Sequence, residues 1–453
     1  MSRARLACLI ASSLAVASGA ACGLDVRLGG AAIDAGEPDG TLDAPDDVRD
    51  AFASADGDAF ATTDGASDAA SDGADDAPTD AIDAADASDA SDAGDAGDGA
   101  DAFDAGDASD AADANDADAA LVCAPPLADC DGLPGNGCEI NLSNDGTHCG
   151  RCDRNCLGAT CVSGQCSAVT VAQSILGPTW LAVDAQSVFV TTRGHAGTVA
   201  DPNEVLRIDL PASAPVKIAD GAGQFEGIAL GAPLVFYVRH AAAPTETDVR
   251  RNDRTGALAS FAVVAQNAVS DGLGIAVDGT DVYWAAGTSL YRATTSTVSV
   301  TGTAFAQPFT RPYGVATDAT RVYVTDETAG TLSFVDRATG TVTTYVVGGT
   351  PRGIAVDATH VYTAAGDRLV RVVKATGVVE PLESGLVNAT DIAQDGVRLF
   401  FGSGTQVLTR LKFTMGRVPL AAGTFSSVGH LATDAAYVYF TDPVGGKVYR
   451  VAK

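Results

Sequence analysis

Seven aromatic or charged residues stand at similar places in a repeated pattern, each shortly before or at the start of an apolar run. They are Trp180, Glu226, Asp271, Tyr313, Arg352, Asp391 and His430. Aromatic rings stack on flat or sugar-like ligands, and the charged side chains add charge-assisted hydrogen bonds. Such a set could bind a protein, a peptide or a saccharide, or it could only solvate a loop face.

Signals for other chemistry are missing from the sequence. No Gly-x-Ser-x-Gly, Walker loop, dinucleotide fingerprint or His-Glu-x-x-His motif occurs. His195, His240 and His360 are scattered, as is typical of loop or surface histidines. All ten cysteines lie between Cys8 and Cys166, so the later chain has no thiol nucleophile. We therefore favour a binding site over a catalytic one and predict no cofactor, with a divalent cation such as calcium left open.

The seven residues are positioned by seven repeats. Each repeat has a small-apolar-Ala-apolar-Asp segment, a short turn and an apolar-aromatic-apolar triplet, as in Gly314-Val315-Ala316-Thr317-Asp318 with Val322-Tyr323-Val324. The fifth positions are residues 184, 231, 278, 318, 357, 395 and 434, which are 47, 47, 40, 39, 38 and 39 residues apart. Short β-branched and aromatic runs between Gly, Asp and Thr turns predict strands, and this period is typical of a propeller blade.

The repeats predict an all-β fold, a seven-bladed β-propeller over residues 168–453, with the seven residues at the mouth of its central channel. The fifth-position aspartates can accept hydrogen bonds from turn amides, so we expect a structural role for them. Residues 168–172 precede the first inner strand. We predict that they pair into the last blade and close the ring.

The repeats resemble those of the NHL and YVTN propellers, best in Gly353-Ile354-Ala355-Val356-Asp357 and in Gly314-Val315-Ala316 with Tyr323-Val324-Thr325-Asp326-Glu327. They resemble the streptogramin lyase and gluconolactonase families more loosely, which implies an alternative function as a lyase or lactonase with an active site at the channel mouth. The His and Glu constellation of streptogramin lyases has no residue-by-residue match. For the divalent metal of gluconolactonases, only Glu226, Asn388 and Asp391 are comparable.

Eight cysteines precede the repeats: Cys123, Cys130, Cys138, Cys149, Cys152, Cys156, Cys161 and Cys166. Their even number in a segment with almost no hydrophobic core predicts a disulfide-rich module over residues 121–167, whose connectivity stays open. Zinc at Cys149-x-x-Cys152 with His148, and a calcium loop between Asp129 and Glu139, are alternatives. Residues 128–166 resemble a Cys-rich module found in exported proteins of gliding, fruiting bacteria, which implies surface biology.

Residues 22–120 are rich in Asp and Ala. Positions 31–120 hold 28 acidic residues and one Arg, which accounts for −27 of the formal charge of −30. Their few large apolar side chains cannot offset a backbone entropy of about 1 to 2 kcal/mol per residue, so we predict a disordered, self-repelling tether. Calcium capture is the alternative. No segment carries the net positive charge that a nucleic-acid partner needs.

The first residues predict export. Arg3 and Arg5 precede an apolar stretch from Leu6 to Ala17 that is too short to span a bilayer, which is typical of a signal peptide, here residues 1–21. Gly19-Ala20-Ala21-Cys22 resembles the bacterial lipoprotein cleavage motif, which implies acylation of Cys22 and membrane contact through the lipid alone. We expect a protein of the cell envelope, outer membrane or cell surface, or a secreted one, that acts as a binding or interaction platform.

Overall fold

The computed structural model describes residues 122–193, 203–242, 245–255, 262–269 and 271–453. The predicted signal peptide, Cys22, the acidic segment and His195 lie outside the described residues. Every regular element within the described ranges is a β-strand. No helix in this part of the chain is long and apolar enough to cross a membrane.

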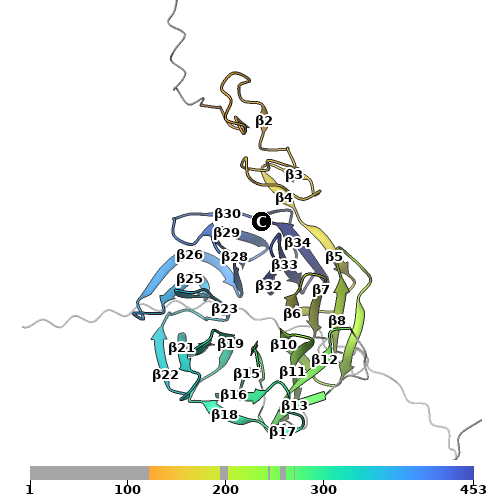
Figure 1. Cartoon of the computed structure of the whole chain (residues 1–453), viewed down its shortest axis with the longest axis vertical. Helices are drawn as coiled ribbons and strands as arrows, with labels where there is room; N and C mark the ends of the chain where they lie inside the picture. The colour runs from red at the N-terminus through yellow and green to blue at the C-terminus, as the bar shows by residue number, and fades with distance from the viewer. Residues whose placement is uncertain (1–121, 194–202, 243–244, 256–261, 270) are drawn as a thin grey trace, which may run out of the picture. The chain divides into compact units, whose positions relative to one another are not determined.

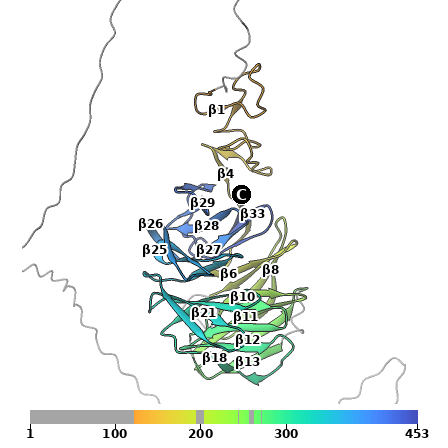
Figure 2. The ribbon, with the colours of Figure 1, turned by 60° about the vertical axis from the view of Figure 1, so that its left-hand side comes forward.

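Each of the seven repeats builds one sheet, and the strands of a sheet follow one another outward from the centre (Figure 1). The first three sheets are β6 (Pro178–Val183), β7 (Ser187–Thr192), β8 (Asn203–Asp209) and β9 (Val216–Gly221); β10 (Gln224–Gly231), β11 (Leu234–Ala242), β12 (Thr245–Asp253), β13 (Ala262–Asn267) and β17 (Val300–Thr301); and β14 (Ile275–Asp278), β15 (Asp281–Ala286), β16 (Ser289–Thr294) and β18 (Thr303–Ala306). Figure 2 shows β10 to β13 side by side.

The other four sheets have four strands each. They are β19 (Pro312–Thr317), β20 (Arg321–Asp326), β21 (Thr331–Asp336) and β22 (Val342–Val346); β23 (Gly353–Val356), β24 (His360–Ala364), β25 (Gly366–Val373) and β26 (Val379–Ala389); β27 (Ile392–Gln394), β28 (Arg398–Ser403), β29 (Gln406–Leu411) and β30 (Arg417–Pro419); and β32 (Leu431–Thr433), β33 (Tyr437–Asp442), β34 (Lys447–Ala452) and β5 (Val169–Gln173).

The inner strands form a closed ring. They contact one another in the cyclic order β6, β10, β14, β19, β23, β27, β32 and back to β6. The ring is completed by β5, which pairs antiparallel with β34, so that Ala172 lies opposite Val448 and Val169 opposite Arg450. The predicted β-propeller and its closure by the segment before the first repeat are both confirmed.

The number of sheets differs from the prediction. The described residues form eight sheets of three or more strands, not seven. The extra sheet joins β3 (Cys161–Val162) and β4 (Gln165–Ser167) to β31 (Ala421–Ala422), which runs parallel to β4. Its strands come from the Cys-rich module and from the loop after β30, outside the repeats. Counting repeats therefore could not reveal it.

The eight cysteines of the module form four disulfides. The pairs are Cys123–Cys138, Cys130–Cys152, Cys149–Cys161 and Cys156–Cys166. The predicted disulfide framework is thus confirmed, and its sulfurs are bonded to one another rather than free as thiolates. A two-stranded sheet of β1 (Leu127–Ala128) and β2 (Ile140–Asn141) completes the module.

The hydrophobic core lies between neighbouring sheets. The central aromatic residue of every triplet is almost fully buried there: Phe189, Phe236, Tyr283, Tyr323, Tyr362, Phe400 and Tyr439. The core also extends to the Cys-rich module, because Cys156 and Cys166 pack in one cluster with Leu420 and Phe425. The aromatic triplet is therefore the part of the repeat that holds adjacent sheets together.

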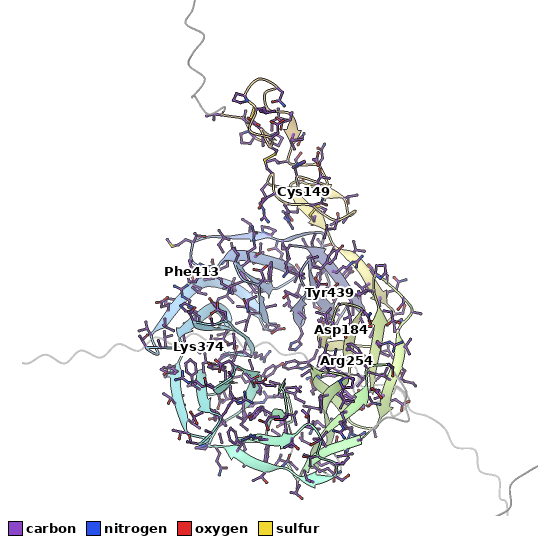
Figure 3. The ribbon with its side chains drawn as sticks, viewed as in Figure 1. Cys149, Asp184, Arg254, Lys374, Phe413 and Tyr439 are labelled. Carbon is purple, nitrogen blue, oxygen red and sulfur yellow. A yellow bond between two sulfur atoms is a disulfide. The ribbon has the colours of Figure 1, made fainter. Side chains whose placement is uncertain are left out.

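The aspartate at the end of the inner strand has two structural roles. Asp318 Oδ1 accepts hydrogen bonds from the N–H groups of Thr320 and Arg321, 2.9 Å each, as predicted for a tight turn. The other oxygen receives a cation that follows the third strand of the next sheet. Five such pairs occur in the described residues: Asp184–Arg254, Asp278–Arg337, Asp318–Lys374, Asp357–Lys412 and Asp395–Lys453. Figure 3 labels both members of the first pair, Asp184 and Arg254, and Lys374 of the third.

Candidate functional site

Glycines at the start of the inner strands bring the preceding residues to the ring axis. In three sheets the glycine N–H donates a 2.9 Å hydrogen bond to a carbonyl of the next sheet: Gly227 to Leu273, Gly274 to Tyr313, and Gly353 to Thr390. A Cβ at any of these glycines would collide with the neighbouring backbone. This close approach requires glycine. The residue before each inner-strand glycine, such as Glu226, Tyr313 or Arg352, therefore stands at the same place in its own sheet.

Three other sheets carry a large side chain in place of this glycine. These residues are Trp180, Asp391 and His430. The Trp180 and His430 rings stack with their centroids 3.9 Å apart and an interplanar angle of 20°. Trp180 also lies 5.7 Å from the Tyr313 ring at 25°. Residues from the first, fourth and seventh sheets thus form one aromatic cluster across the centre of the ring of inner strands.

Arginines held by buried carboxylates surround this cluster. Arg352 Nε donates to Glu327 Oε2 at 2.6 Å, and its guanidinium lies 5.5 Å from the centre of the Tyr313 ring. Glu327 also pairs with Arg311. In the same way Arg193 Nε donates to Glu226 Oε1 at 2.6 Å. The glutamates are buried and the arginines are partly exposed, so the carboxylates orient cations that remain open to a ligand.

A histidine and an aspartate form a second polar pair. His430 Nδ1 lies 3.2 Å from Asp391 Oδ2, which also accepts the Leu431 N–H at 2.7 Å. The His430 Nδ1 contact does not have hydrogen-bond geometry, and the buried Glu226 Oε2 also lacks a hydrogen-bond partner in the described part of the chain. Neither atom uses its hydrogen-bonding capacity on another described residue.

The electrostatics keep the centre of the site in defined protonation states. Burial raises the pKa of the Tyr313 hydroxyl to about 12. The positive charges of Arg352 and Arg193 oppose this rise, while the negative charges of Glu226 and Asp391 add to it. Tyr313 is therefore a neutral hydrogen-bond donor at physiological pH. Burial works against the charge of Arg193, but Glu226 outweighs it and raises its pKa.

Six of the seven predicted mouth residues lie at or next to the start of the inner strand of their sheet. Asp271 is the exception. Asp271 is exposed, has a φ of 60°, and its N–H lies 3.3 Å from His240 Nδ1. The corresponding place in the third sheet belongs to Leu273, which is buried. The sequence-based alignment therefore placed the mouth residue of the third sheet two positions too early.

Sequence reasoning missed Arg193, Glu327 and Arg311. Arg193 and Glu327 are the fifth residues after the start of their triplets, directly after β7 and β20. The same position is glycine in the third, fifth and sixth sheets: Gly287, Gly366 and Gly404. A charged residue where other repeats have glycine was the available signal. Arg311 precedes the inner strand and carried no such signal.

The residues considered for metal binding lie in different places. Asn388 is exposed in β26, whereas Glu226 and Asp391 are buried at the inner strands. In the module, the carboxylates of Asp129, Asp131 and Glu139 lie close together, where a calcium loop was considered. They accept hydrogen bonds from amides of their own loop, namely those of Gly132, Leu133 and Cys130.

Comparisons with known proteins relate this chain to other propellers by fold alone. No protein-family model matches the sequence, and no curated protein does. A streptogramin B lyase structure superposes with a TM-score of 0.52 at 10% identity, over 63% of this chain and 96% of that one. Virginiamycin B lyase from Staphylococcus aureus gives 0.50 at 12% identity, over 63% and 98%. A catalytically inactive variant of that lyase with quinupristin gives the same values.

Proposed function

We propose that this chain is an exported, lipid-anchored surface protein whose propeller binds a ligand at the channel mouth. The observation that carries the proposal is the convergence of Trp180, Tyr313 and His430 with arginines fixed by buried glutamates. A repeat protein whose only task was structural would have no reason to replace glycine with bulky or charged residues at this one level of the ring. The cluster therefore supports a binding role.

The chemistry of the mouth favours a peptide or saccharide that carries an anionic group. Tryptophan and tyrosine rings can stack on a sugar or a planar side chain. Arg352 and Arg193 use their Nε atoms for the glutamates, so their terminal nitrogens are the natural donors to a carboxylate or phosphate. The neutral Tyr313 hydroxyl adds a donor at the centre of the same surface.

Export is supported by the disulfides, since such crosslinks persist in oxidising compartments. The acidic segment would then act as a spacer between lipid and module. For about 90 residues the flexible-coil estimate gives roughly 50 to 60 Å, and charge repulsion would extend it. Labelling with radioactive palmitate tests the anchor. We expect incorporation into the wild type, loss in Cys22→Ser and no change in Cys8→Ser, whereas no incorporation into the wild type would remove the anchor.

Binding at the mouth is tested with a thermal-shift screen of the exported chain against cell-wall fragments, saccharides and acidic peptides. Any hit is then titrated against Arg352→Gln and against Arg368→Gln, a control arginine paired with the exposed Asp367. We expect a loss of about tenfold in affinity only for Arg352→Gln, because one charge-assisted hydrogen bond disappears. Equal affinity of both variants would place the ligand elsewhere.

A lyase or lactonase is the second candidate function, and the His430–Asp391 pair favours it. A histidine held beside a carboxylate can act as a general base. The test is turnover of quinupristin and of simple lactones with and without added divalent cations. Product formation that is lost in His430→Ala would support this candidate, and no turnover under any of these conditions would leave binding as the function.

A further inference from the structure

A cleft of about 470 Å³ lies between the Cys-rich module and β30. Its walls include Arg151, Arg154 and Gln165 from the module and Val418 and Pro419 from β30. None of its lining residues is acidic. The cleft is on the outer side of the sixth sheet, where β30 is the last strand of the order, and its residues take no part in the channel mouth.

Arg154 is the unusual residue of this cleft. Only 6% of its surface is exposed. One terminal nitrogen, Nη2, donates to the carbonyls of Leu420 at 2.5 Å and Ala452 at 3.3 Å. Its Nε is buried without a hydrogen-bond partner in the described part of the chain. No carboxylate within the described ranges forms an ion pair with it, so Arg154 is a buried cation held only by neutral groups.

Positive charge accumulates around Arg154. Burial, with the charges of Arg151 and Arg398 added, lowers its pKa to about 10. The same kinds of effect, burial and then Arg151, lower the pKa of Arg398. Asp153, which is largely exposed and pairs with Arg151, offsets part of this charge, because it raises the pKa of Arg154. A buried cation without an anion is costly, and an anion in the cleft would remove that cost.

We propose that this cleft binds an oxyanion, with the guanidinium groups of Arg151 and Arg154 as the principal donors. Two guanidinium groups can bind a carboxylate, phosphate or sulfate in a planar, bidentate manner. The Gln165 amide and the Ser163 hydroxyl, also in the wall, supply further polar atoms. The anion can belong to an external molecule or to the aspartates that directly precede the module in the chain. This site is independent of the ligand proposed for the channel mouth.

The test uses the full exported chain and sodium sulfate as the probe. Thermal unfolding is followed at low millimolar sulfate against sodium chloride of equal ionic strength. We expect a saturable rise in Tm for the wild type and an approximately tenfold higher half-saturating concentration for Arg151→Gln, since one charged donor is lost. Arg151 is about one-third exposed, so this variant should fold, whereas substitution of Arg154 would also remove the contacts to Leu420 and Ala452.

Arg368→Gln is the matched control, because Arg368 also pairs with a neighbouring exposed aspartate but is not among the residues that line the cleft. It should respond to sulfate as the wild type does. An equal response of both variants, or no sulfate effect beyond that of chloride, would overturn the proposal. Replacing Asp107, Asp110, Asp113, Asp116 and Asp118 by Asn identifies the source of the anion. Tighter sulfate binding assigns the cleft to the chain's own carboxylates, and unchanged binding assigns it to an external anion.

Discussion

Replacing Lys412 by methionine should destabilise the propeller strongly. The side chain is 2% exposed, and its Nζ lies 2.9 Å from Asp357 Oδ2 of the preceding sheet and 2.7 Å from Gln394 Oε1. Methionine keeps the length and the apolar stem but removes the charge. Asp357 would then remain in a mostly apolar boundary between two sheets without its cation. The variant therefore measures how much one inter-sheet pair contributes to the ring.

The size of the effect follows from the surroundings of Asp357. Removing one partner of a buried ion pair costs roughly 3 to 5 kcal/mol. Asp357 keeps hydrogen bonds from the Thr359 and His360 amides and from the Tyr362 hydroxyl, and its side chain is 18% exposed. These contacts reduce the penalty, so we expect a loss of about 2 to 3 kcal/mol in the free energy of unfolding.

Equilibrium urea denaturation, followed by tryptophan fluorescence, measures this loss, because the chain has two tryptophans and Trp284 is fully buried in the third sheet. Lys447→Met is the control, since Lys447 has no carboxylate partner among the described residues, and it should stay within about 0.5 kcal/mol of the wild type. The double variant Asp357→Asn, Lys412→Met should lose about 1 to 3 kcal/mol less unfolding free energy than the sum of the losses in the two single variants. Additive effects, or a stable Lys412→Met, would refute the reasoning.

Three further perturbations probe the same architecture. Acidification below about pH 4 should lower stability. Burial opposes the ionisation of Asp318 and Asp357, but the lysines, tyrosines and turn amides around them lower both pKa values from 3.8. As the pH falls, the unfolded chain therefore binds protons before the folded protein does, and the folded state loses stability. The urea midpoint measured at several pH values should fall accordingly. Replacing Cys156 and Cys166 by serine should cost about 2 to 3 kcal/mol through the lost crosslink across 10 residues, seen as a lower urea midpoint. Gly314→Ala should lower the Tm by several degrees, because its Cβ would collide with the Arg352 carbonyl.

Each of these experiments has an internal control. The stability of Lys412→Met should depend less on acid than that of the wild type, because its Asp357 has already lost the lysine that lowers its pKa. Serines at Cys123 and Cys138 remove a crosslink between two partly buried residues that belong to no propeller core cluster, so the propeller transition should stay in place. Gly396→Ala should be neutral, since a Cβ there meets nothing within 4 Å. A control that loses as much stability as its test variant, or more, would contradict the corresponding argument.

The repeats were sufficient to predict the ring and its closure, because both depend on local patterns. The triplet aromatic, such as Tyr323, is buried wherever the triplet occurs, and the aspartate turn of Asp318 follows from the identity of one residue. The pairing of β5 with β34 follows from a strand that precedes the repeats and an edge left open by the last one.

What the sequence could not predict depends on contacts between distant segments. The pairing of β4 with β31 joins positions that share no pattern, and the four disulfides depend on how the module folds. The alignment of the repeats was enough to place Tyr313 and Arg352 beside the inner-strand glycines of their sheets. It could not show that Glu327 pairs with Arg352, because that contact joins two neighbouring sheets.

The closing strand also has mechanical consequences. A pull on the N-terminal side of the module enters the crosslinked loops before it reaches β5. The pairing of β4 with β31 and the hydrogen bonds from Arg154 to the carbonyls of Leu420 and Ala452 resist this force. These contacts must yield before tension can peel β5 from β34. The ring is thus shielded from a load applied through its own leading segment.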